Sequence, residues 1–116
     1  MKRKLIWTLP VLDELEQYVK YLEQKNPNAA KQLVTRIFTS VKPLVNFPGM
    51  GRPIQQIEEA KRKAEYRLAL EAIPETDLEL KELIIDKYTL MYGYNEKAVV
   101  ILFMKHQAEH DYAIER

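Results

Sequence analysis

The sequence predicts a single α+β domain, with a short N-terminal strand, an antiparallel two-helix hairpin and an antiparallel meander sheet packed on the helices. Three observations predict it. Apolar residues recur at helical spacing in two N-terminal stretches, segments typical of strands fill the C-terminal part, and most connections are short. A chain of 116 residues can bury one hydrophobic core, so residues 1–116 are expected to form one domain.

A strand and an amphipathic helix are expected first. Leu5-Ile6-Trp7 is apolar and bulky, which favours a strand. Thr8 and Pro10 then mark a helix entry, because threonine can accept hydrogen bonds from the free N–H groups of a first turn and proline is tolerated there. The helix should end near Lys25, and its apolar stripe consists of Leu12, Leu15, Tyr18, Val19 and Leu22.

A second helix should follow at once. Asn26-Pro27 is a strong boundary, since asparagine is a good N-cap and proline a good first helical residue. Pro43 should kink or loosen the last turn. The short link predicts an antiparallel hairpin. The apolar stripe of this helix consists of Ala30, Leu33, Ile37, Val41 and Leu44, flanked by Val34 and Phe38.

Two connecting segments come next. Phe47-Pro48-Gly49-Met50-Gly51-Arg52-Pro53 contains two prolines and two glycines, which predicts a tight turn without regular structure. Residues 54–77 look like an inserted segment with conflicting patterns. Charge pairs such as Glu58/Arg62 favour a helix, whereas the alternation that begins at Tyr66 favours a strand. We expect a helix that gives way to an extended segment near Tyr66.

Three strands are expected in the C-terminal part. They span Leu80 to Ile85, Tyr88 to Tyr94 and Ala98 to Met104, and the last two are joined by a hairpin connection at Asn95-Glu96-Lys97. The run from Val99 to Phe103 is apolar on both faces, which predicts a central strand.

Composition and charge exclude several classes of protein. The formal net charge is +1, so whole-chain charge predicts neither a nucleic-acid nor a membrane partner. The absence of cysteine excludes disulfides and cysteine-based zinc sites. The apolar run after the basic N-terminus stops at Pro10, too early for a signal peptide, and no run is long enough to span a bilayer. We therefore expect a cytoplasmic protein without a cofactor.

An ordered set of residues over nearly the whole chain carries a resemblance. It consists of Leu12 to Leu22, Asn26-Pro27 with Ala29-Ala30, Leu33-Val34, Arg36-Ile37, Leu44, Phe47-Pro48, Met50-Gly51-Arg52-Pro53, Glu82-Leu83-Ile84-Ile85, Tyr88-Thr89-Leu90-Met91-Tyr92, and Val99 to Met104 with His106. The set resembles the ParE/RelE superfamily of type II toxins, also known as plasmid stabilisation proteins. Residues 54–77 lie outside the resemblance.

The resemblance implies a partner and a target. Toxins of this superfamily are made with a cognate antitoxin, whose helical or extended tail wraps the toxin and blocks it. ParE-like members poison DNA gyrase, and RelE-like members cut mRNA in the ribosome. The chain departs from the pattern at Lys81, Thr89 and Glu109, where relatives often carry arginine. The differences at Thr89 and Glu109 lower the positive charge of the face that would contact gyrase or nucleic acid.

Candidate catalytic residues exist only for the ribonuclease alternative. Cleavage of RNA without a metal needs an acid, a base and cations for the phosphate, and the candidates are His106, Tyr112, Arg52 and Lys81. The structural alternative for His106 is that it merely ends a strand. Arg52 has two readings, as a grip for phosphate or a partner carboxylate, or as a structural residue that caps helix carbonyls or pairs with a glutamate.

Two further patterns favour structural interpretations. His106 and His110 have the spacing of two metal ligands on a helix face, but the sequence places no third ligand, so we predict no metal site. Tyr88, Tyr92 and Tyr94 share one face of a strand. They could stack on bases or line an antitoxin groove, and packing beneath the helices is the favoured interpretation.

The sequence as a whole favours a ParE-like toxin that binds its target without catalysis and is neutralised by an antitoxin. One alternative is a RelE-like, metal-independent endoribonuclease that acts on mRNA in the ribosome. Another is a non-toxic protein-binding member of the superfamily. The sequence leaves the oligomeric state, including a homodimer, open.

Overall fold

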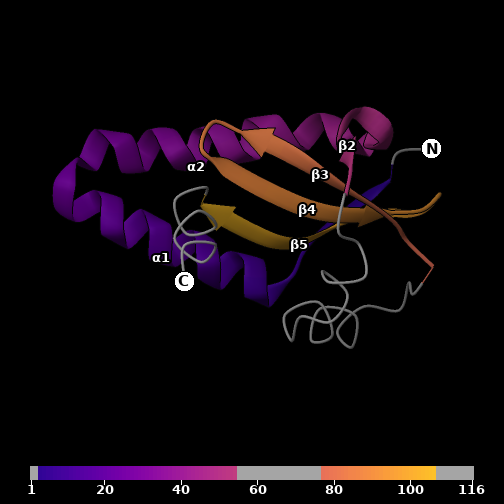
Figure 1. Ribbon diagram of the computed structural model, residues 1–116, viewed down its shortest axis with the longest axis horizontal. Helices are drawn as coiled ribbons and strands as arrows, with labels where there is room; N and C mark the ends of the chain where they lie inside the picture. The colour runs from indigo at the N-terminus through magenta and orange to yellow at the C-terminus, as the bar shows by residue number, and fades with distance from the viewer. Residues whose placement is uncertain (1–2, 55–76, 107–116) are drawn as a thin grey trace.

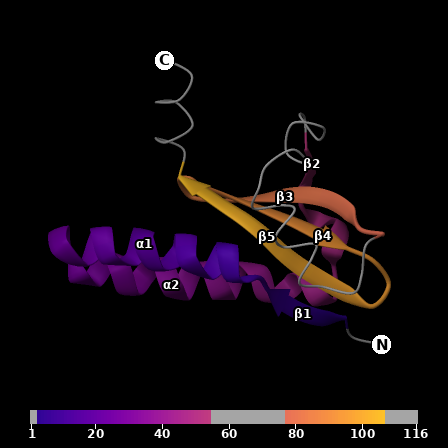
Figure 2. The same cartoon turned by 90° about the horizontal axis from the view of Figure 1, so that it is seen from below.

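The computed structural model describes residues 3–54 and 77–106. Figure 1 shows the two long helices side by side, and Figure 2 shows both of them on one face of the sheet. With η denoting a 3-10 helix, the elements in chain order are β1 (Lys4–Trp7), α1 (Leu9–Lys25), α2 (Pro27–Val41), η1 (Lys42–Val45), η2 (Pro48–Met50), β2 (Arg52–Pro53), β3 (Glu79–Ile85), β4 (Tyr88–Tyr94) and β5 (Ala98–His106).

The five strands form one mixed sheet in the order β1-β5-β4-β3-β2. Strand β1 pairs parallel to β5, and the other neighbours are antiparallel, as the predicted meander requires. Strand β5 lies between β1 and β4, which confirms the central strand predicted from its two apolar faces. It extends to His106, two residues beyond the predicted end at Met104.

The helix boundaries follow from local chemistry. The side chain of Asn26 accepts hydrogen bonds from the N–H groups of Asn28 (3.1 Å) and Ala29 (3.3 Å), which confirms the predicted N-cap of α2. The helix begins where Thr8 and Pro10 predict, with Thr8 as the N-cap residue of α1 and Pro10 in the first turn. The expected capping bond from the Thr8 side chain is not formed: its hydroxyl donates to the carbonyl of Ile101 at 2.7 Å and so ties the start of the helix to β5. Regular helix ends at Val41, and η1 follows across the predicted proline.

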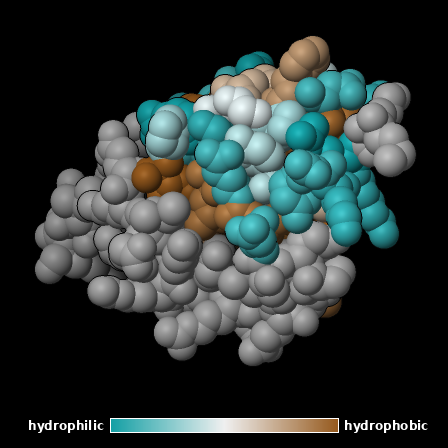
Figure 3. Space-filling model, turned by 90° about the vertical axis from the view of Figure 1, so that its right-hand side faces the viewer, coloured by the Kyte–Doolittle hydropathy of each residue, from teal (hydrophilic) through white to brown (hydrophobic). Residues whose placement is uncertain are grey.

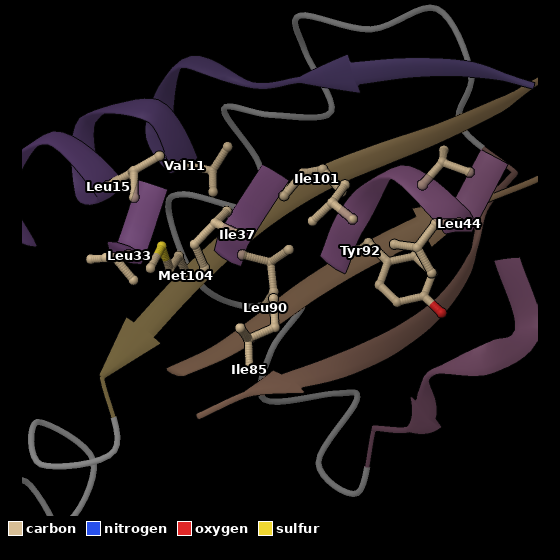
Figure 4. Close-up of a cluster of buried hydrophobic side chains, with 12 residues drawn as sticks. Val11, Leu15, Leu33, Ile37, Leu44, Ile85, Leu90, Tyr92, Ile101 and Met104 are labelled. Atoms are coloured by element: carbon tan, nitrogen blue, oxygen red, sulfur yellow. The ribbon is translucent and has the colours of Figure 1, made fainter. Parts of the chain in front are cut away.

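The main core lies between the helices and the sheet. Figure 4 shows side chains from α1 and α2 pointing toward those of β3, β4 and β5. The predicted stripe of α2 is buried throughout. On α1, Val11 is buried and Leu12 is exposed, so the buried stripe is turned by one residue at its start. The core consists of Val11, Leu15, Leu33, Ile37, Val41, Leu44, Ile85, Leu90, Tyr92, Val99, Ile101 and Met104.

A second buried cluster lies on the other face of the sheet. Side chains alternate along the first part of β5, where Val99 and Ile101 face the helices and their neighbours face away. A bulge in the pairing with β4 then leaves both Leu102 and Phe103 on the far face. The cluster consists of Leu80, Ala98, Val100, Leu102 and Phe103. Both faces of β5 are therefore buried, as its sequence predicts.

The Pro/Gly-rich turn contains more regular structure than predicted. Pro48–Met50 forms a 3-10 turn, and Arg52–Pro53 joins the sheet as the edge strand β2. Proline is tolerated there because an edge strand needs hydrogen bonds on one side only. The expected helix-to-strand change near Tyr66 in the inserted segment lies outside the described residues.

No helix in the described part of the chain is long and apolar enough to cross a membrane.

Candidate functional site

The Pro/Gly-rich loop is held against the sheet by one buried side chain. The hydroxyl of Tyr92, on β4, donates a hydrogen bond to the carbonyl of Pro48 and accepts one from the N–H of Gly51 at 3.0 Å. Figure 4 shows this hydroxyl at the edge of the core, pointing away from the labelled apolar side chains. Burial raises the pKa of Tyr92, so the hydroxyl stays protonated and able to donate. Tyr92 therefore fixes both ends of the 3-10 turn.

The close approach of the loop to the sheet explains a glycine at position 51. A Cβ atom there would lie 2.5 Å from the hydroxyl oxygen of Tyr92 and 2.6 Å from the carbonyl oxygen of Glu82. At Gly49 the nearest atom to such a Cβ would be the Tyr94 hydroxyl, 3.9 Å away, which is an ordinary contact. Of the two loop glycines, only Gly51 is required by the packing around it.

Arg52 is already paired within its own chain. Its Nε lies 2.6 Å from Oε1 of Glu82, directly across the β2–β3 pair. This geometry matches the structural reading of Arg52, in which the arginine pairs with a glutamate. Sequence reasoning missed Glu82, because its pairing with Arg52 depends on the strand register.

Lys81 and Arg52 lie on opposite faces of the sheet. Arg52 is paired in register with Glu82, which follows Lys81 on β3, and successive residues of a strand point to opposite faces. Lys81 shares the helix-facing side with its cross-strand partner Tyr92. The two cations predicted to act together on a phosphate are thus separated by the sheet itself.

His106 ends β5, as its structural reading proposed. Its backbone N–H donates to the hydroxyl of Tyr18 at 3.1 Å, and its ring lies 4.9 Å from that of Tyr88, centroid to centroid. His106 is opposite Tyr88 on β4, whereas Lys81 is opposite Tyr92, four residues away or about 13 Å along the strand. The register does not bring His106 and Lys81 together.

Other predicted ligands and acids fall outside the described residues. Tyr112 and His110 lie there, so the structure does not relate them to His106. His106 itself lies in a strand, where the helical spacing behind the two-histidine pattern does not apply. Among residues 3–54 and 77–106, no group of three or more histidine, aspartate or glutamate side chains is arranged to hold a metal ion.

The tyrosine row of β4 packs against the core. Tyr92 is fully buried, and the partly buried rings of Tyr88 and Tyr94 pack against the same cluster. This confirms packing as the main role of the row. The hydroxyl of Tyr94 donates to Oε2 of Glu79 at 2.6 Å, and this bond raises the pKa of Tyr94 to about 12.

Two side chains of α1 complete the free edge of β5, and sequence reasoning missed both. Strand β1 pairs with β5 only as far as Ile101. Beyond it, the N–H of Met104 donates to Oε1 of Glu14 at 3.1 Å, and Tyr18 accepts from His106. Glu14 and Tyr18 are one helical turn apart, which nearly matches the two-residue repeat of a strand. In the sequence, the four-residue spacing of Glu14 and Tyr18 was the only sign that they could serve together as acceptors.

Comparisons with known proteins agree with this architecture. A model of the family described as "ParE toxin of type II toxin-antitoxin system, parDE" matches residues 5–111. The protein Y4kP of Sinorhizobium fredii (strain NBRC 101917 / NGR234) is named as a toxin, and this chain is 44% identical to it over 54 residues. That match covers 46% of this chain and 56% of Y4kP, so the chain matches little more than half the length of that relative.

A solved structure shares the fold. It is described as a chromosomal ParDE TA system from P. aeruginosa, and the superposition has a TM-score of 0.62 at 20% sequence identity. The alignment covers 90% of this chain and 96% of the other. The two-helix hairpin on a sheet is thus the architecture of a known toxin–antitoxin component.

Proposed function

Because the chain belongs to the ParE toxin family of type II toxin–antitoxin systems, we propose that it arrests growth by binding a target protein in the cytoplasm, without catalysis. The target proposed is DNA gyrase, as in ParE-like toxins. A cognate antitoxin is proposed to bind the toxin and neutralise it. The match to a ParDE system supports an antitoxin partner, since the fold is shared over almost the whole of both chains.

The observation that carries a binding role is the separation of the ribonuclease candidates. Arg52 is neutralised by Glu82 and lies on the face of the sheet opposite Lys81. His106 lies about 13 Å along the strands from Lys81. Metal-independent RNA cleavage needs an acid, a base and a cation within hydrogen-bond reach of one phosphate. These three residues do not meet that requirement, which supports binding over catalysis.

The test is inducible expression of the full chain, with a supercoiling assay on purified gyrase. We expect growth arrest and inhibited supercoiling, with mRNA left intact in a translating extract. The variant His106→Ala should arrest growth as the wild type does. Cleaved mRNA that disappears with His106→Ala would instead establish the ribonuclease alternative. Unaffected growth and supercoiling would favour a non-toxic binding protein.

Neutralisation is tested by co-expression. We expect the reading frame beside the toxin gene to encode the antitoxin and to restore growth when both are induced. A chain that arrests growth equally with and without that frame would contradict this part of the proposal.

A further inference from the structure

Two large apolar side chains stand exposed together on the Pro/Gly-rich loop. Phe47 is 67% exposed and Met50 is 53% exposed. The N–H of Met50 donates to the carbonyl of Phe47 at 3.2 Å, the i to i+3 bond of a 3-10 turn. Side chains three residues apart in such a turn lie on the same side. Phe47 and Met50 therefore form one projection, which we call the apolar knob.

The backbone beneath the knob is fixed from both sides. The N–H of Phe47 donates to the carbonyl of Pro43 at 2.9 Å, at the end of η1. The buried hydroxyl of Tyr92 bonds Pro48 and Gly51, which flank the turn. A rigid loop loses little conformational entropy when it binds. The knob thus has the preorganisation expected of an interface anchor.

Charged side chains beside the knob are engaged in bonds within the chain. Arg52 is paired with Glu82, and Glu79 accepts the hydrogen bond of Tyr94, the ring nearest Gly49. Figure 3 shows this end of the molecule, where hydrophobic residues reach the surface among hydrophilic ones. Binding to nucleic acid is driven by unpaired cations that contact phosphate, and the guanidinium of Arg52 beside the knob is already paired. Its chemistry fits an apolar pocket on a protein.

We propose that the apolar knob is the anchor by which this chain engages the folded protein that it inhibits, with Phe47 and Met50 inserted into an apolar pocket. A convex, rigid projection requires a concave partner. A folded target has such pockets, whereas an antitoxin tail, extended or helical, has none. The inference rests on the proposed function and adds to it the contact surface on the toxin.

The test compares two double variants of the full chain. Phe47→Ala/Met50→Ala removes the knob, and Leu9→Ala/Ile84→Ala removes two apolar side chains elsewhere, which are 74% and 46% exposed. All four side chains are exposed, so neither variant should lose its fold, as circular dichroism and thermal unfolding would verify. We measure growth arrest on induction and the toxin concentration that halves gyrase supercoiling.

Loss of the knob should raise the half-inhibitory concentration at least about 30-fold, because truncation of an interface anchor weakens binding by that order. The control double variant should stay within about twofold of the wild type. The variant Phe47→Leu/Met50→Leu keeps an apolar knob and should retain most of the inhibition. Wild-type inhibition by the alanine variant would overturn the inference and leave the proposed function standing.

The remaining outcomes separate the two proposals. If the wild type arrests growth without affecting gyrase, the gyrase assignment fails and growth arrest becomes the test of the knob. Loss of growth arrest only in the knob variant would then support the inference. Growth arrest retained by the knob variant would overturn it. If the knob variant still arrests growth but is no longer rescued by the antitoxin frame, the knob belongs to the antitoxin interface and the inference is wrong. A wild type inactive in both assays overturns both proposals.

Discussion

The hydroxyl of Tyr92 accepts a hydrogen bond from the N–H of Gly51 at 3.0 Å, across 41 positions of sequence. The same hydroxyl donates to the carbonyl of Pro48, so one buried side chain on β4 closes the loop that follows the helical hairpin. The shape of the proposed contact surface therefore depends on a residue of the sheet beneath it.

Removal of this hydroxyl should destabilise the fold. Tyr92→Phe leaves a buried carbonyl and a partly buried N–H without their partner, at a cost of about 1–3 kcal/mol in the free energy of unfolding. Denaturant titration measures it. Tyr94→Phe is the matched control, since it removes an exposed bond to Glu79 and should cost less than about 0.5 kcal/mol. Equal effects of the two variants would contradict the anchoring role of Tyr92.

The two loop glycines should respond differently to alanine. Gly51→Ala forces a Cβ into the Tyr92 hydroxyl and the Glu82 carbonyl, and we expect a loss of about 1–3 kcal/mol of stability. Gly49→Ala meets only an ordinary contact and should change stability by less than about 1 kcal/mol. Thermal unfolding of the two variants side by side checks this. A tolerated Gly51→Ala would show that the loop is less closely packed than described.

Arg52 should be dispensable for activity. Its ion pair with Glu82 is exposed on the arginine side and screened by solvent, so Arg52→Gln should cost less than about 1 kcal/mol of stability. Because the guanidinium is engaged within the chain, growth arrest should persist. Glu82→Gln is the partner control, and the double variant measures their coupling. Loss of growth arrest in a folded Arg52→Gln protein would restore the functional role of Arg52, as a grip for phosphate or a partner carboxylate.

Tyr94 should titrate well above an ordinary tyrosine. The hydrogen bond to Glu79 raises its pKa from 10.0 to about 12. Because the folded pKa is the higher one, the contribution of this group to stability is present in full below pH 10 and is lost as the pH rises through about 12. The difference in tyrosinate absorbance between the wild type and Tyr94→Phe gives the midpoint. Glu79→Gln should lower that midpoint, and an unchanged midpoint would exclude Glu79 as the cause.

Much of the fold could be predicted from the sequence, because interactions between residues close together along the chain determine it. Asn26-Pro27 ends one helix and begins the next through bonds over two or three residues. The apolar run from Val99 to Phe103 is buried on both faces wherever it sits in a sheet, so its central position was predictable. Periodicity and caps act locally, and local chemistry is what a sequence displays directly.

The arrangement of the candidate site was harder to predict from the sequence, because it depends on the register between strands. Whether Arg52 faces Glu82 or Lys81 is decided by a shift of one residue, which would reverse the face of every side chain on the strand. The same register sets His106 apart from Lys81. Sequence reasoning proposed these residues as a catalytic set because it had residue types and no distances.

The sequence by itself determined the scaffold: a strand, a helical hairpin, a Pro/Gly-rich turn and three strands. Only the tertiary structure decided how the turn is held and which of its side chains are exposed. It placed the Tyr92 hydroxyl under the loop, paired Arg52 within the chain, and left Phe47 and Met50 exposed on a fixed backbone. Burial and pairing between distant segments follow from how the helices and the sheet pack together, and no local pattern of residues encodes them.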